Sequence, residues 1–152
     1  MMDKIYCVQR NLPMKIMAID LGDVRTGVAF SDLTGMIAGR AYTITEYSRD
    51  KLLARLCTEL AAEQPDEVVL GLPINMNGTE GERAAKSRAF ASQLEEKWGK
   101  PIVLWDERGT SVTANRILSD AGKKRGRQRA QVDAVAASVI LQAYLDYRNR
   151  TR

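Results

Sequence analysis

Carboxylate side chains stand where predicted apolar strands end. Asp20 closes one apolar run, and Asp106 and Glu107 follow another. In open α/β sheets, ligands bind outside the carboxyl ends of the strands, so these acids are candidates for a common site. Asp133, expected in the first turn of a closing helix, could join them. Carboxylates without a histidine suit oxygen-ligated Mg²⁺ or Mn²⁺, and a pair of such ions can promote hydrolysis of a phosphodiester.

Each acid also has an ordinary structural explanation. An aspartate near a glycine, as Asp20 is, is common in turns. An acid near a helix N-terminus, as Asp133 would be, is favoured by the helix macrodipole alone. A catalytic site and a purely structural role are therefore both open for each residue taken singly.

The composition excludes several other kinds of site. The chain of 152 residues has no histidine, and its two cysteines, Cys7 and Cys57, are far apart. Histidine-based acid–base catalysis, Ser-His or Cys-His nucleophilic pairs and a structural zinc site are thereby ruled out, and a disulfide framework is not expected. The apolar runs are too short to span a membrane and the N-terminus has no hydrophobic signal region, so the expected compartment is the reduced cytosol.

Basic residues are concentrated in two places. The run KKRGRQR carries five cations, Lys123, Lys124, Arg125, Arg127 and Arg129, and the tail after residue 147 carries three more. Of the chain's 23 Lys and Arg, 15 remain elsewhere, against 19 Asp and Glu. A concentrated basic surface on a mildly acidic body is typical of polyanion binding, so nucleic acid is the expected partner.

Apolar periodicity and turn residues predict one α/β domain. Buried strands are predicted at 15–20, 24–32, 36–44, 67–73 and 101–105. Helices are predicted at 49–63, from a capping box of Thr79 and Glu82 to about Trp98, at 111–120 and at 130–148. A meander of three strands followed by strand–helix alternation indicates a mixed sheet. We expect a dispensable extension at 1–13, the domain at 14–148 and a basic tail at 149–152.

The segment DLGDVRTG, from Asp20 to Gly27, allows a second interpretation. Glycines on a β-hairpin resemble the phosphate-binding hairpin of the actin-like and sugar-kinase ATPases. Those ATPases need two such domains facing each other, and one domain of this length offers no second lobe. A nucleotide-binding regulator remains a hypothesis, which a rise in melting temperature with ATP would support.

Four ordered segments together resemble the YqgF/RuvX family, namely DLGDVRTGVAFSD, VVLGLPINMNGTEG, WDERGTS and QVDAVAASVILQAYLD. The family contains bacterial ribonuclease H-like proteins, described as Holliday junction resolvases and as nucleases that mature the 5′ end of pre-16S ribosomal RNA. The resemblance covers about 15–148. It implies a ribonuclease H-like fold, with a five-stranded mixed sheet in the order 3-2-1-4-5 flanked by helices.

The resemblance also implies a metal-dependent phosphodiesterase site. Asp20, Glu107 and Asp133 match the family's carboxylates and would hold Mg²⁺ or Mn²⁺, while Arg25 and Arg108 fall on motif arginines expected to meet phosphate. Successive strand residues point to opposite faces, so one of Asp106 and Glu107 should face the metal, and Glu107 is favoured. Gly109 departs from the family pattern, which usually has leucine there.

The expected function is hydrolysis of structured nucleic acid by a monomer or homodimer, with pre-ribosomal RNA favoured and branched DNA second. A non-catalytic RNA- or junction-binding protein on the same fold is the alternative. Clustered carboxylates separate the two, since a binder gains nothing from negative charge beside phosphates.

Overall fold

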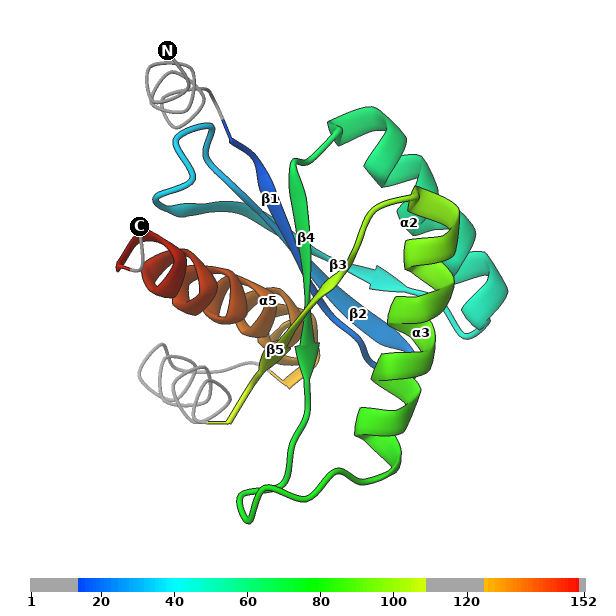
Figure 1. Ribbon diagram of the computed structural model, residues 1–152. Helices are drawn as coiled ribbons and strands as arrows, with labels where there is room; N and C mark the ends of the chain where they lie inside the picture. The colour runs from blue at the N-terminus through cyan, green and yellow to red at the C-terminus, as the bar shows by residue number, and fades with distance from the viewer. Residues whose placement is uncertain (1–13, 109–124, 151–152) are drawn as a thin grey trace.

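The computed structural model describes residues 14–108 and 125–150, and within the last helix it describes the side chains from residue 134 onward. A five-stranded sheet in the order β3-β2-β1-β4-β5 forms the centre of the molecule (Figure 1). The strands are β1 (Ile16–Asp20), β2 (Arg25–Ser31), β3 (Ala38–Thr45), β4 (Glu67–Leu72) and β5 (Val103–Asp106). The helices are α2 (Arg49–Glu63), α3 (Glu82–Trp98) and α5 (Arg125–Arg150).

The predicted sheet topology is confirmed. Strand β2 pairs antiparallel with both β1 and β3, whereas β4 pairs parallel with β1 and with β5. The turn between β2 and β3 has Gly35 in the left-handed region at φ 70°. The carboxyl ends of β1, β4 and β5 therefore meet at one edge of the sheet.

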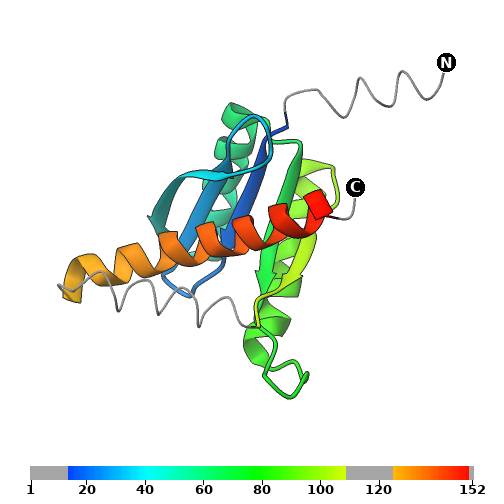
Figure 2. The same ribbon diagram turned by 90° about the vertical axis from the view of Figure 1, so that its left-hand side faces the viewer.

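Side chains alternate between two apolar layers. Ile16, Ala18 and Val69 pack against α5, whereas Met17 and Ile19 pack under α2 and α3. Figure 2 shows α5 crossing one face of the sheet while α2 and α3 lie behind it. Helix α2 buries four leucines against the sheet, Leu52, Leu53, Leu56 and Leu60. Across the described ranges, no helix is both long and apolar enough to cross a membrane.

Helix α5 begins earlier than the sequence predicts. The expected start was residue 130, whereas the helix begins at Arg125 and so includes Arg127 and Arg129. Arginine and glutamine are good helix formers, which explains why the part of the basic run from Arg125 onward is helical. As a result, Asp133 lies about two turns into the helix and not in its first turn. The predicted helix at 111–120, together with Lys123 and Lys124, lies outside the described residues.

The predicted capping box at the start of α3 is wrong. The N-cap residue is Gly81, which offers no side chain, and the helix begins at Glu82. Thr79 is held in the preceding loop, where its backbone N–H and its hydroxyl both donate to Asn77 Oδ1, at 3.0 and 2.6 Å. The asparagine satisfies the threonine locally, so Thr79 does not cap the helix.

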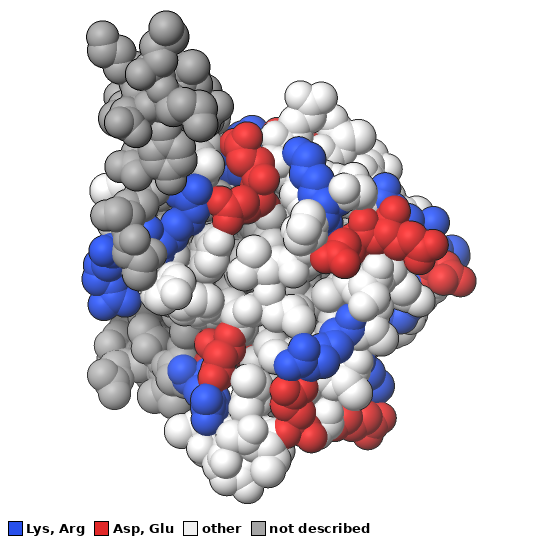
Figure 3. Space-filling model, in the orientation of Figure 1, with Lys and Arg blue, Asp and Glu red and all other residues white. Residues whose placement is uncertain are grey.

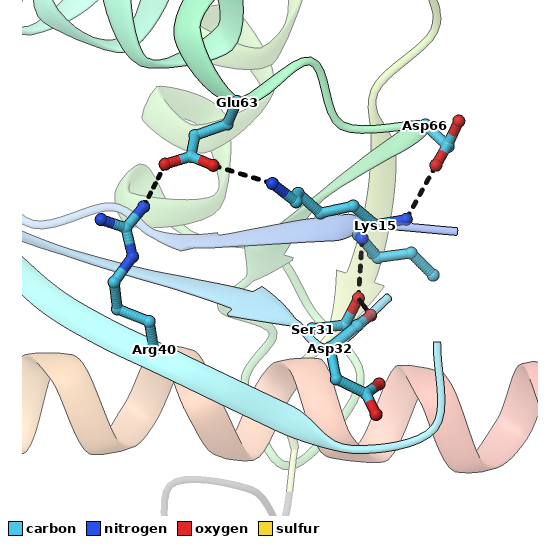
Figure 4. Close-up of polar contacts among 7 residues, drawn as sticks. Lys15, Ser31, Asp32, Arg40, Glu63 and Asp66 are labelled. Atoms are coloured by element: carbon cyan, nitrogen blue, oxygen red, sulfur yellow. Dashed lines mark hydrogen bonds and ion pairs between the residues drawn. The ribbon is translucent and has the colours of Figure 1, made fainter. Parts of the chain in front are cut away.

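A polar network ties the amino-terminal edge of β1 to its neighbours (Figure 4). Lys15 Nζ donates to Glu63 Oε2 at 2.9 Å at the end of α2, and Arg40 of β3 binds the other oxygen of the same carboxylate. The Lys15 backbone N–H donates to Asp66 Oδ2 at 2.7 Å. The Ile16 N–H donates to the buried Ser31 hydroxyl at 2.8 Å. This edge is the end of the sheet opposite to the predicted site.

Candidate active site

Three adjacent strands bring Asp20, Gly71 and Glu107 to one face of the sheet. Register pairs Ile19 with Leu70 and Gly71 with Trp105, so the strand ends are aligned. Residues two positions before each of the three belong to the layer against α5. By alternation, Asp20 and Glu107 lie on that same face at the carboxyl edge. Glu107 follows β5 directly, and its N–H continues the ladder by donating to Leu72 O at 3.2 Å.

The Glu107 carboxylate is lodged over Gly71. A Cβ atom at residue 71 would lie 2.4 Å from Glu107 Oε2 and 2.7 Å from Ile140 Cδ1 of α5. Burial raises the pKa of the Glu107 carboxyl above its usual range, an effect that Arg83 opposes and Asp106 reinforces. A desolvated carboxylate of this kind is stabilised by a cation brought next to it. The position therefore suits a ligand for a hard divalent ion.

Asp106 is engaged in a different interaction. Its Oδ2 accepts from Arg108 Nε at 2.8 Å, and its Oδ1 accepts from the Arg108 backbone N–H at 2.9 Å. The Arg108 guanidinium holds the pKa of the Asp106 carboxyl below its usual range. Of the two neighbouring acids, Glu107 thus lies on the α5 face and Asp106 is paired with the arginine.

The structure places the other predicted site residues as follows. Arg25 starts β2 and, by alternation with Ala29, belongs to the same sheet face as Asp20. Asp133 falls in α5, the helix that covers this face, within the stretch whose side chains are not described. Among the described side chains alone, no group of three acids or cysteines is close enough to hold a metal ion. The predicted three-carboxylate cluster therefore stays a prediction.

A hollow of about 460 Å³ opens beside Glu107. Its walls come from the β4–α3 loop, from the first turn of α3 and from the residues after β5, including Asn75, Arg83 and Arg108. From the sequence alone, Arg83 is one of four arginines, with Arg25, Arg88 and Arg108, that could contact phosphate, and it is not among the predicted site residues. One arginine among many cations carries no spacing signal, and it is the packing of α3 against β4 that brings Arg83 to Glu107.

Elsewhere on the surface, charges are interspersed. The face drawn in Figure 3 shows acidic and basic side chains lying next to one another among uncharged ones. On α3 and the loop before it, Arg88 and Glu80 form such an ion pair, with Nε and Oε1 2.7 Å apart. Glu107 at the sheet edge differs from these surface acids, because its carboxylate is half-buried and packs over a glycine.

Comparison of sequences identifies close relatives. The family model described as "RuvX: Holliday junction resolvase" matches residues 14–147. A protein of Myxococcus xanthus is 44% identical over 133 residues, which are 88% of each chain. A protein of Halothermothrix orenii is 39% identical over 137 residues, covering 90% of this chain and 98% of its own. Both carry the name "Putative pre-16S rRNA nuclease".

Comparison of structures supports the fold. RuvC of Thermus thermophilus in complex with a Holliday junction substrate matches with a TM-score of 0.59 at 15% identity, over 91% of this chain and 97% of its own. A fowlpox virus resolvase bound to Holliday junction DNA matches with a TM-score of 0.56 at 14% identity, over 88% and 98%. At such identities the likeness establishes a common ribonuclease H-like fold.

Proposed function

Because the chain belongs to the RuvX family, we propose that it is a divalent-metal-dependent nuclease that hydrolyses phosphodiester bonds in structured nucleic acid. The observation that carries the proposal is the half-buried Glu107 carboxylate, lodged over Gly71 on the sheet face to which Asp20 also belongs. Partial desolvation of a carboxylate at a strand end costs free energy in the free protein, and a bound metal ion offsets that cost.

Asp20, Glu107 and Asp133 would hold Mg²⁺ or Mn²⁺, which supplies an activated water and stabilises charge on the leaving oxygen. The protein's own residues orient the substrate. Arg108, fixed by Asp106, faces the hollow beside Glu107 and can bind a phosphate oxygen. The pairing holds its guanidinium in one orientation, which lowers the entropic cost of binding.

Pre-ribosomal RNA is the favoured substrate, because relatives about 40% identical over most of the chain are named for it. Branched DNA is the second candidate, on the description of the family and on the junction-bound structures of the same fold. Both substrates are polyanions with duplex segments, and the basic start of α5 suits either.

Cleavage by wild type and Asp20→Asn tests the proposal. Pre-rRNA-like hairpins and a four-way DNA junction would each be incubated with Mg²⁺ or Mn²⁺. The substitution keeps the shape of the side chain and removes one charge, so cleavage should fall at least a hundredfold while binding persists. Without metal, Asp20→Asn should be at least as stable as wild type, because repulsion between carboxylates is relieved.

The thermal response to metal is a second readout. Wild type should gain melting temperature on adding Mg²⁺ or Mn²⁺, and Asp20→Asn should gain much less. Asp23→Asn removes an acid of the same type three residues away and should keep the full metal response. Cleavage by Asp20→Asn at the wild-type rate would overturn the assignment of this residue. A wild type that binds nucleic acid but is inert with both metals would establish the binding-protein alternative.

A further inference from the structure

A second hollow, of about 160 Å³, lies on the other side of the β1 strand end. The turn after β1 forms one wall through Leu21, which points into the layer under α2 and α3. The first residues of α2 and α3 form the other wall and contribute three cations, Arg49, Arg83 and Lys86. No function described above uses this hollow.

One of the three cations is held in place. Arg49 Nη1 donates to the carbonyl of Gly22 at 2.8 Å, and its guanidinium carbon lies 5.8 Å from the centre of the Phe90 ring. A guanidinium fixed in this way has other N–H groups left to donate and loses little entropy when it binds an anion. Lys86 and Arg83 are exposed on consecutive turns of α3 beside it.

The carboxylates paired with Arg49 and Lys86 are bound loosely. Glu82 Oε1, one turn before Lys86 on α3, lies 3.5 Å from Lys86 Nζ, and the Glu82 side chain is 83% exposed. Asp23 Oδ1 lies 3.6 Å from Arg49 Nη2 and 3.7 Å from Lys86 Nζ, while the Asp23 side chain is 80% exposed. Charge-assisted hydrogen bonds are shorter, at about 2.7–2.9 Å, and exposed ion pairs contribute little stability. A phosphate, with more acceptor oxygens, can therefore replace Asp23 at small cost.

Arg83 connects this hollow to the proposed catalytic edge. Its side chain lines both hollows, the one beside Glu107 and the one beside Asp23. A polynucleotide whose reacting phosphate lies at Glu107 would thus meet a continuous series of cations across the end of β1.

We propose that the hollow between the β1–β2 turn and α3 binds a backbone phosphate of the polynucleotide next to the one that is cleaved. Arg49, Arg83 and Lys86 bind this phosphate, and Asp23 occupies its place in the free protein. The inference rests on the proposed function for the identity of the ligand. It assigns the flanking strand to the α3 side of the sheet edge, away from the start of α5.

Binding of a labelled four-way DNA junction and a labelled RNA hairpin, in EDTA and over a range of salt concentrations, tests the site. Lys86→Gln and Arg83→Gln should each weaken binding several-fold and lower the log–log salt slope by about 1 on duplex. Arg88→Gln removes the same charge from the same helix, but Arg88 is paired with Glu80 through two hydrogen bonds. It should leave the slope unchanged, and all three variants should keep the wild-type melting temperature.

Replacing Asp23 should change the affinity for nucleic acid in the opposite direction. Asp23→Asn should bind more tightly than wild type, whereas Glu96→Gln, which removes an exposed acid near the other end of α3, should not. Unchanged affinity and slope in Lys86→Gln, with Asp23→Asn equal to wild type, would overturn the inference.

Cleavage assays separate this outcome from failure of the proposed function. If wild type cleaves and Lys86→Gln binds as well as wild type, the proposed nuclease function stands and the proposed phosphate site is overturned. If binding shows the expected dependence on these charges but wild type never cleaves, the phosphate site stands and the proposed nuclease function is overturned. Absence of binding by wild type would overturn both.

Discussion

At the scale of single residues, the site depends on a side chain that is absent. Gly71 lies in β4 between two strands, and its missing Cβ leaves the space that the Glu107 carboxylate and Ile140 occupy. The carboxylate is thereby half-buried against the sheet, which raises its pKa and favours a cation beside it. The space over Gly71 is thus as necessary to the proposed site as the Glu107 carboxylate itself.

Replacing Gly71 with alanine should therefore disable the site without unfolding the protein. The new Cβ would lie within 2.4 Å of Glu107 Oε2, so the carboxylate must move away. Both contacted atoms are ends of flexible side chains, so the loss of stability should be about 1–3 kcal/mol. The rate of cleavage should fall at least tenfold. The rise in melting temperature on adding metal should fall by more than half.

Ile140→Val is the matched control for Gly71→Ala. It should cost about 0.5–1.5 kcal/mol through a small cavity, while Glu107 stays in place and cleavage is retained. Urea denaturation measures both losses of stability. Full cleavage by Gly71→Ala would show that the position of Glu107 over this glycine does not matter for activity.

The choice between Asp106 and Glu107 shows how far the sequence leads at this scale. Strand alternation and resemblance favour Glu107, and the structure adds that Asp106 is paired with Arg108. Neither the partner of Asp106 nor the approach of Arg83 could be predicted. Both depend on how loops and α3 pack in three dimensions, which local patterns do not record.

At the scale of elements, apolar periodicity predicts the strands and helices that burial stabilises. It does not predict the residues at which helices begin, which depend on local hydrogen bonds and helix propensity. The five strands and α2 are predicted close to their observed bounds, because burial sets their apolar pattern. The order of the strands in the sheet, which is also observed, was implied by the resemblance to the family and not by periodicity. The starts of α3 and α5 are not predicted correctly. Asn77 captures Thr79 in the first case, and a charged but helix-favouring sequence extends the helix in the second.

The Glu63 carboxylate joins the end of α2 to the sheet through Lys15 and Arg40. Its contribution to stability should therefore depend on pH. Lys15 first, and Arg40 second, lower the pKa of Glu63 from its usual 4.5. A lowered folded-state pKa stabilises the fold above the unfolded value, and this contribution is lost as the pH falls through the folded value. Glu63→Gln should therefore cost about 1 kcal/mol or less at pH 7, and its deficit relative to wild type should shrink below pH 4.5.

Urea denaturation at pH 7 and at pH 3 measures this difference. Glu96→Gln, in which an exposed acid of α3 is replaced, should show no deficit at either pH. An equal deficit of Glu63→Gln at both pH values would mean that packing of the side chain, and not its charge, anchors α2 to β1.

At the scale of the whole molecule, α5 joins the two halves of the proposed function. The helix begins in the basic run and then crosses the sheet face that holds Asp20 and Glu107 (Figure 2). Ile140, further along the same helix, lies against the space over Gly71 beside Glu107. The sequence alone shows that basic residues are concentrated in one run. Only the fold shows that the helix beginning in this run covers the sheet face of the proposed site.

The basic run should therefore supply much of the binding free energy for nucleic acid. Replacing Lys123, Lys124, Arg125, Arg127 and Arg129 with glutamine should weaken binding and reduce the log–log salt slope by roughly 4 to 5 on duplex DNA. We expect the free energy of unfolding to change little, since surface charges in general contribute little to folding. The control replaces four exposed cations with glutamine, two in α2 and two at or just after the end of α3, namely Lys51, Arg55, Lys97 and Lys100. It should reduce the salt slope far less per charge removed. Equal losses per charge in the two variants would mean that net charge alone, and not the placement of the run at the start of α5, determines binding.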